Sequence, residues 1–149
     1  MSITMGQLKV PSGWETRTQV TFLEPVDAGL KVPLATQQTA PKPRGNIVVS
    51  RHKADSGTAA EAMEQFMAQT GQAIPGLKKL GQSPLAFGDG VKGESVTISF
   101  HATPQVRLAQ RHVFRVDAGV LTQLVATVEE HRAADLEGSL AQLMMTFHP

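Results

Sequence analysis

Apolar and polar residues alternate along much of the chain with the two-residue period of half-buried strands. The clearest case is residues 95–101, where Val96, Ile98 and Phe100 alternate with Ser, Thr and His side chains. Similar patterns, bounded by turn residues, predict further strands at residues 3–10, 16–23, 46–50, 77–87, 106–116 and 120–128. The turn residues at 117–119 predict that the last two of these form a hairpin.

Two other segments repeat their apolar residues every three or four positions, which is typical of amphipathic helices. The first begins near Thr58, where Glu61 stands at capping-box spacing, and ends at Pro75. Its stripe is formed by Met63, Phe66, Met67, Thr70 and Ile74. The second runs from about residue 135 to 147, with one face formed by Leu136, Leu140, Leu143, Met144 and Phe147.

Strands joined by short turns, together with two helices, indicate an α+β domain built on an antiparallel sheet. Because each helix has a single apolar stripe, we expect both helices to pack on one face of that sheet. The chain, residues 1–149, has the size of a single domain. Residues 24–45 carry four prolines and therefore predict a long surface loop.

The composition argues against several classes of function. Fourteen basic and thirteen acidic side chains give a net charge of +1, and only 5% of the residues are aromatic. We therefore expect no nucleic-acid partner, because such a surface needs a basic patch or stacking aromatics. The sequence has no cysteine, no signal-peptide pattern and no apolar run of membrane-spanning length. These features predict a cytoplasmic protein without a membrane anchor of its own.

The candidate motifs for catalysis or cofactor binding have simpler explanations. Residues 88–93 match the G-x-G-x-x-G spacing of dinucleotide sites, but a strand follows them where that site needs a helix. The five histidines lack the close spacing of a helical metal motif. The charged run at 129–132 falls in the polar link before the last helix, where charges are normally solvated. We therefore expect a protein that is not an enzyme and binds no metal or other cofactor.

One face of the predicted sheet is polar but nearly uncharged. If Val20 and Val49 face the helices, strand alternation places a second set of residues on the opposite face. That set is Gln19, Thr21, Asn46, Val48 and Ser50, with Leu108, Gln110, His112 and Phe114 as the matching hairpin positions. Solvated sheet faces usually carry Lys and Glu, so their absence favours a surface covered by a partner. A homodimer interface or an ordinary face rich in Thr and Ser would give the same pattern.

Four short motifs occur in an order that resembles a known family. They are Pro11-x-x-Trp14, Asn46-Ile-Val-Val-Ser-Arg51, Ile74-Pro75-Gly76-Leu77 and Arg111-His-Val-Phe114. They span most of the chain and resemble the DcrB-related family, and within it the Eag chaperones of type VI secretion. The resemblance implies a Mog1/PsbP-like fold, usually dimeric. It also implies a cytoplasmic chaperone that binds the hydrophobic N-terminal transmembrane segments of an effector until the effector is loaded on the secretion spike.

The resemblance also implies a set of partner-binding residues. Family members can carry one glutamine in the long helix and another in the Arg-x-Val-Phe window, where this chain has Gln65 or Phe66, depending on the alignment, and His112. The expected partners are the effector helices, the spike protein and a second copy of the chain. The alternative is another non-enzymatic interaction module of the PsbP, Mog1 or DcrB type, because likeness of fold alone does not choose the activity. The full expected set is Gln19, Thr21, Asn46, Val48, Ser50, Gln65, Phe66, Gln110 and His112.

Overall fold

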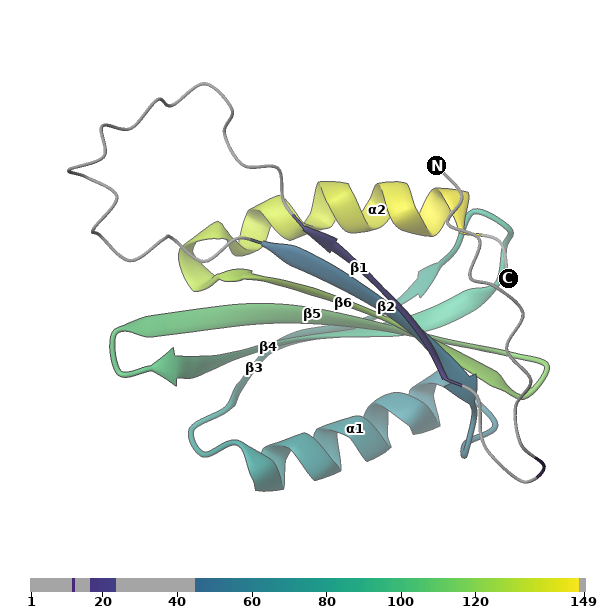
Figure 1. Ribbon diagram of the computed structural model, residues 1–149, viewed down its shortest axis with the longest axis horizontal. Coiled ribbons are helices and arrows are strands. Elements are labelled where there is room, and N and C mark those ends of the chain that lie inside the picture. Colours follow the sequence, from purple (N-terminus) through teal and green to yellow (C-terminus); the bar gives the residue numbers. More distant parts are fainter. Residues whose placement is uncertain (1–11, 13–16, 24–44, 148–149) are drawn as a thin grey trace.

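The computed structural model describes Ser12 and residues 17–23 and 45–147 (Figure 1). The strand expected at 3–10, Trp14 and nearly all of the loop expected at 24–45 lie outside the described residues. In chain order the elements are β1 (Thr18–Leu23), β2 (Asn46–Lys53), α1 (Ala59–Ala73), β3 (Lys78–Ala86), β4 (Lys92–Thr103), β5 (Val106–Asp117), β6 (Val120–Glu129), the 3₁₀ helix η2 (Glu130–Asp135) and α2 (Leu136–Thr146).

The described strands form one antiparallel sheet in the order β1-β2-β6-β5-β4-β3. Strands β3 to β6 follow one another as a meander, and β2 lies beside β6. The β5–β6 hairpin closes through Ala118 and Gly119, both with positive φ, as a two-residue type I′ turn requires. The predicted α+β class with an antiparallel sheet is confirmed.

The two helices lie on opposite faces of the sheet, so the expectation that both share one face is wrong (Figure 1). Neighbouring residues of β5 show the arrangement directly. Val113 belongs to the apolar cluster that contains Leu140 of α2, whereas Phe114 belongs to the cluster that contains Met63 of α1. The physical reason is that β5 and β6 carry apolar residues on both faces, and each apolar face needs its own covering layer.

Helix α1 begins as its sequence predicts. The Thr58 hydroxyl accepts a hydrogen bond from the Glu61 N–H (3.2 Å), and Glu61 Oε2 accepts one from the Gly57 N–H (3.0 Å). Met63 is buried and Phe66 packs against the same cluster, so the predicted stripe faces the sheet. The helix lies mainly over β4 and β5, and most of β6, β2 and β1 is not covered by it on this face.

The layer on the α2 side contains a buried cation. The Arg115 side chain is only 1% exposed, and its guanidinium binds Asp89 (Nη1 to Oδ1, 2.9 Å) and Asp117 (Nη2 to Oδ1, 3.1 Å). It also lies 4.9 Å from the ring centroid of Phe87 and 5.1 Å from that of Phe147. The hydrogen bond from Arg115 is the main cause that lowers the pKa of Asp89 below its ordinary value. Arg115 thereby joins β5 to the turn before β4 and to the end of α2.

Candidate functional site

The sheet register places the strand residues expected to bind a partner on one continuous face, the face on which α1 lies. Residues that pair directly across neighbouring strands share a face. One such row is Thr21–Val48–Val125–His112, and the rows beside it are Gln19–Ser50–Gln123–Phe114 and Asn46–Thr127–Gln110. We call this surface the amide face and define it by Gln19, Thr21, Asn46, Val48, Ser50, Gln110, His112, Gln123, Val125 and Thr127.

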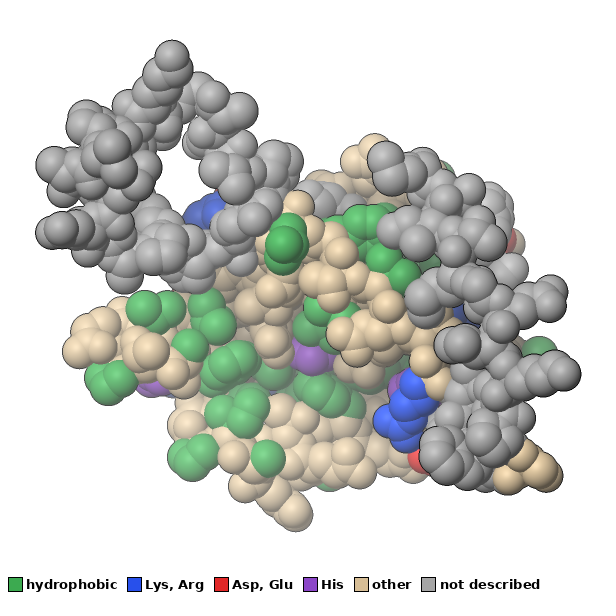
Figure 2. Space-filling view, in the orientation of Figure 1, with side chains coloured by type: hydrophobic (Ala, Val, Ile, Leu, Met, Phe, Trp, Pro, Cys, Tyr) green, Lys and Arg blue, Asp and Glu red, His purple; other side chains and the backbone are tan. Residues whose placement is uncertain are grey.

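The amide face carries amides, hydroxyls and aliphatic groups but almost no charge. On β1, β2, β5 and β6, the described positions that point to this side include no Lys, Arg or Asp, and Glu129 at the end of β6 is the only acidic one. Figure 2 shows hydrophobic side chains gathered on the visible surface between α1 and the strands, with few charged ones among them. Such a surface can lie against an apolar partner without removing water from an ion.

Four polar side chains of the amide face bind one another in a chain. Gln110 Nε2 donates to Thr127 Oγ1 (3.1 Å), and Gln110 Oε1 accepts a hydrogen bond from His112 Nε2 (3.0 Å). At the other side of the imidazole, His112 Nδ1 accepts a hydrogen bond from Gln123 Nε2 (3.0 Å). This pattern requires a neutral imidazole with its proton on Nε2. Each of these side chains therefore has a hydrogen-bond partner inside the protein, without help from water.

Helix α1 meets the amide face through Phe66. The Phe66 ring centroid lies 4.2 Å from that of His112 and 5.5 Å from that of Phe114. Gln65, the neighbouring helix residue, is exposed. Of the two helix positions expected from the sequence, Phe66 is therefore the one that packs on the sheet, where its ring lies against His112, an inner member of the hydrogen-bonded chain.

Sequence reasoning missed the contribution of β6. Gln123, Val125 and Thr127 lie between the expected residues of β2 and those of β5, and two of them take part in the hydrogen-bonded chain. The hairpin register contains the signal that would have found them. Once residues 118–119 are recognised as a two-residue turn, counting back along both strands pairs Gln110 with Thr127 and His112 with Val125.

His112 is expected to make the protein less stable in mild acid. Burial lowers the pKa of His112 from 6.5 to about 4. Between these two values the unfolded chain binds a proton that the folded protein does not bind. Stability is therefore fully kept above the unfolded pKa and is lost as the pH falls towards the folded pKa. The loss amounts to about 3 kcal/mol once the pH has fallen below the folded pKa.

Urea unfolding in neutral and in mildly acidic buffer measures this loss. Because other groups also titrate, the informative quantity is the difference between the wild type and His112→Gln, which is expected to lose less stability on acidification. His101→Gln, at an exposed histidine, is the matched control and should behave as the wild type. An equal acid sensitivity of His112→Gln and the wild type would show that the buried imidazole is not the cause.

The described residues offer neither a metal site nor a membrane-spanning helix. Within the part of the chain that the structure describes, no group of three or more His, Asp or Glu side chains is arranged to hold a metal ion. Over the same residues, no helix is both long enough and apolar enough to cross a membrane.

Comparisons with known proteins identify the fold. No protein-family model matches the chain, and no curated protein sequence matches it. The crystal structure of PA94, a protein of unknown function from Pseudomonas aeruginosa, matches with a TM-score of 0.70 and 19% sequence identity, over 95% of this chain and 90% of that one. The solution structure of cyanobacterial PsbP (CyanoP) from Synechocystis sp. PCC 6803 matches with a TM-score of 0.50 and 13% identity, over 93% of this chain and 94% of that one. The Mog1/PsbP-like fold expected from the sequence is confirmed.

Proposed function

We propose that this protein is a cytoplasmic, non-enzymatic chaperone of the DcrB-related family. By this proposal it binds the hydrophobic N-terminal transmembrane segments of a type VI secretion effector, as the Eag chaperones do, and helps to load the effector on the secretion spike. It acts as a homodimer, and the amide face is the surface that holds the effector helices. The general class of function that we propose is that of a protein-interaction module.

The observation that carries the proposal is that the amide face is uncharged and hydrogen-bonded within itself. A transmembrane helix in water exposes apolar surface, and covering that surface is worth about 25 cal/mol per Å². The receiving surface must lose its water as well, and a charged side chain there would lose hydration without gaining a partner. Because Gln110, His112, Gln123 and Thr127 already bind one another, water can leave them with little loss of hydrogen bonding.

The size of the side chains supports the same partner. Thr21, Ser50 and Thr127 are small, so an apolar helix can approach the strands closely there, much as helices approach one another at small residues in membranes. Val48 and Val125 lie in the same row as Thr21, between the rows that contain Ser50 and Thr127, and add aliphatic contact. Both the polar and the apolar parts of the amide face are therefore suited to an apolar helix.

Two of the motifs that resemble the Eag chaperones lie on the strands that build this face. The motif at residues 46–51 falls on β2, and the motif at residues 111–114 falls on β5. Alternate residues of both motifs belong to the amide face or to its edge with α1: Asn46, Val48, Ser50, His112 and Phe114. The resemblance and the surface chemistry thus support one location for the partner.

Co-expression with the N-terminal segment of an effector encoded beside this protein's gene tests the proposal. The hydrophobic segment is expected to be insoluble alone, but soluble and co-purifying when this protein is present, since burial on the amide face removes its apolar surface from water. The fraction of the segment left in solution after ultracentrifugation measures the effect.

A second effector segment, with its apolar residues replaced by Ser and Gln, serves as the control. It should be soluble by itself and should not co-purify. Failure of the wild-type protein to keep any such hydrophobic segment in solution would contradict the proposal. If light scattering of the purified complex showed one copy of this protein per complex, the proposal that it acts as a homodimer would be contradicted.

A further inference from the structure

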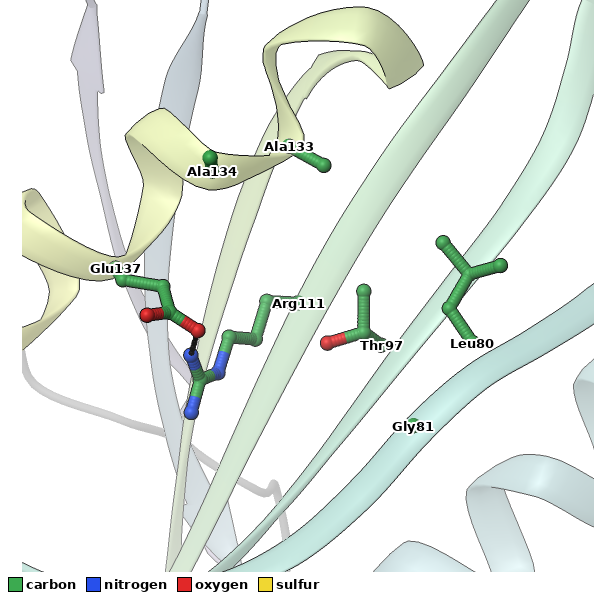
Figure 3. A pocket seen from close by; sticks show the side chains of 7 residues that line it. All are labelled: Leu80, Gly81, Thr97, Arg111, Ala133, Ala134 and Glu137. Atoms are coloured by element: carbon green, nitrogen blue, oxygen red, sulfur yellow. Dashed lines mark hydrogen bonds and ion pairs between the residues drawn. The ribbon is translucent and has the colours of Figure 1, made fainter.

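A pocket of about 300 Å³ lies on the other side of the sheet, away from the amide face. It is formed between the strands β3, β4 and β5 and the start of the C-terminal helical segment (Figure 3). Its volume is at the lower end of the range of small-molecule pockets. A ligand held here would not compete with a partner on the amide face, because the two sites are separated by the sheet.

The pocket has one cationic wall. Arg111 of β5 is 21% exposed, and its Nη1 donates to Glu137 Oε1 at 3.1 Å. Among the described residues the guanidinium makes no other hydrogen bond, so most of its N–H donors are available to a ligand. The Glu137 side chain is 76% exposed, and exposed ion pairs of this kind are weak because water competes for both charges. Another carboxylate can therefore replace Glu137 at little cost.

The remaining walls are apolar or weakly polar. Leu80, Ala133 and Ala134 supply aliphatic surface, and Figure 3 shows them around the space beside Arg111. Thr97 pairs with Arg111 across β4 and β5, and its hydroxyl oxygen points to the side on which Arg111 lies. Gly81 stands opposite Thr97 on β3, where an added Cβ would meet nothing within 4 Å. A site with one arginine, one hydroxyl and aliphatic walls suits a small group with one charged end.

We infer that this pocket binds a carboxylate attached to a short apolar chain. The carboxylate takes the free edge of the Arg111 guanidinium with two N–H···O bonds, in place of Glu137. The apolar chain of the ligand lies against Leu80 and the two alanines, over the space left open at Gly81. Two sources fit this chemistry, a free short-chain acid and the C-terminal carboxylate of a peptide that ends in an aliphatic residue.

Titration of the full-length protein with sodium hexanoate, followed by amide NMR shifts of residues 80, 81, 97 and 111, tests the inference. The wild type should give saturable shifts at millimolar concentration, and uncharged hexanamide should not. N-acetyl-leucine mimics the peptide source, so tighter binding of hexanoate or of N-acetyl-leucine tells which source the pocket prefers. Shifts that do not saturate, or equal binding of hexanamide, would overturn the inference.

Three substitutions are expected to change hexanoate binding: two should weaken it and one should strengthen it. Arg111→Met should weaken hexanoate binding by at least about tenfold, because the charge-assisted hydrogen bonds are lost. Glu137→Gln should tighten it about two- to fivefold, because the competing carboxylate is gone. Gly81→Val should block it by filling the pocket while the Arg111–Glu137 pair stays in place.

Arg107→Met is the matched control, since Arg107 is another β5 arginine on the same face and pairs instead with Glu130. It should leave hexanoate binding unchanged, and circular dichroism should show that every variant is folded. Unchanged binding in folded Arg111→Met, or weaker binding in Glu137→Gln, would show that the carboxylate does not use this pocket.

Discussion

Thr21→Asp is expected to abolish capture of an effector helix while the protein stays folded. Thr21 is an exposed residue of β1, the edge strand of the sheet that the described residues form, and it points to the amide face beside Val48. A carboxylate pressed against an apolar helix loses its hydration and gains no partner. The cost is about 3 kcal/mol, which corresponds to roughly a hundredfold weaker binding. Co-purification of the hydrophobic segment with the variant, compared with the wild type, measures the loss.

The matched control is Thr18→Asp. Thr18 is also an exposed threonine of β1. It lies an odd number of residues from Thr21 and therefore points to the opposite face of the sheet, the α2 side. It should bind the effector segment as the wild type does, and both variants should have thermal stabilities near that of the wild type, because charges are tolerated on edge strands. Ser50→Asp, in the next row of the amide face, should reproduce the effect of Thr21→Asp. Retained capture by folded Thr21→Asp and Ser50→Asp proteins would place the binding surface elsewhere.

Arg115→Met is expected to destabilise the fold by about 3–5 kcal/mol, the usual cost of removing one partner from a buried ionic network. The substitution keeps much of the side-chain volume but leaves Asp89 and Asp117 without their shared cation. It also removes the charge that lies over the Phe87 and Phe147 rings. Urea unfolding at neutral pH measures the change, with an unchanged slope against denaturant as the sign that the folded state is otherwise intact.

Two further variants serve as comparisons, one at Arg115 itself and one at another arginine of β5. Arg115→Lys keeps the charge, but an ammonium lacks the planar guanidinium that donates hydrogen bonds to both carboxylates at once. An intermediate loss of stability is therefore expected. Arg107→Met removes a β5 arginine whose side chain is 24% exposed, and it should cost about 1 kcal/mol or less. Equal losses for Arg107→Met and Arg115→Met would show that the burial of Arg115 is not what makes it important.

The parts of the structure that sequence predicts well are those decided by residues close in the chain. Helix α1 begins after its N-cap Thr58 and ends before Pro75. Both limits can be predicted because helix capping and helix termination by proline depend on residues only a few positions apart. The β5–β6 hairpin follows from its turn residues for the same reason. The amide-face residues of β1, β2 and β5 also follow from sequence, because side chains alternate along a strand whatever the order of strands in the sheet.

Features that depend on contacts between residues distant in the chain cannot be predicted from local patterns. An apolar stripe shows that one side of a helix is buried, but it does not show which face of the sheet buries it, and for this reason the expectation that α1 and α2 share one face is wrong. The pairing of β2 with β6 joins segments that are far apart in the chain, so local patterns do not show that Gln123 and Thr127 lie between the β2 and β5 residues of the amide face. The choice between Gln65 and Phe66 likewise needed the packing of α1 on His112.

The sequence by itself thus determined the α+β class, the helix and strand segments and a nearly uncharged polar surface, since these depend on composition and on short periods. Only the tertiary structure decided that one helix covers each face, that the polar side chains satisfy one another, and that Arg115 is buried between two aspartates. Arginine at a strand position predicts exposure, and only the convergence of Asp89, Asp117 and two aromatic rings makes its burial favourable. Contacts between residues distant in the chain have no signature in local periodicity, because the period records burial and not the neighbour that causes it.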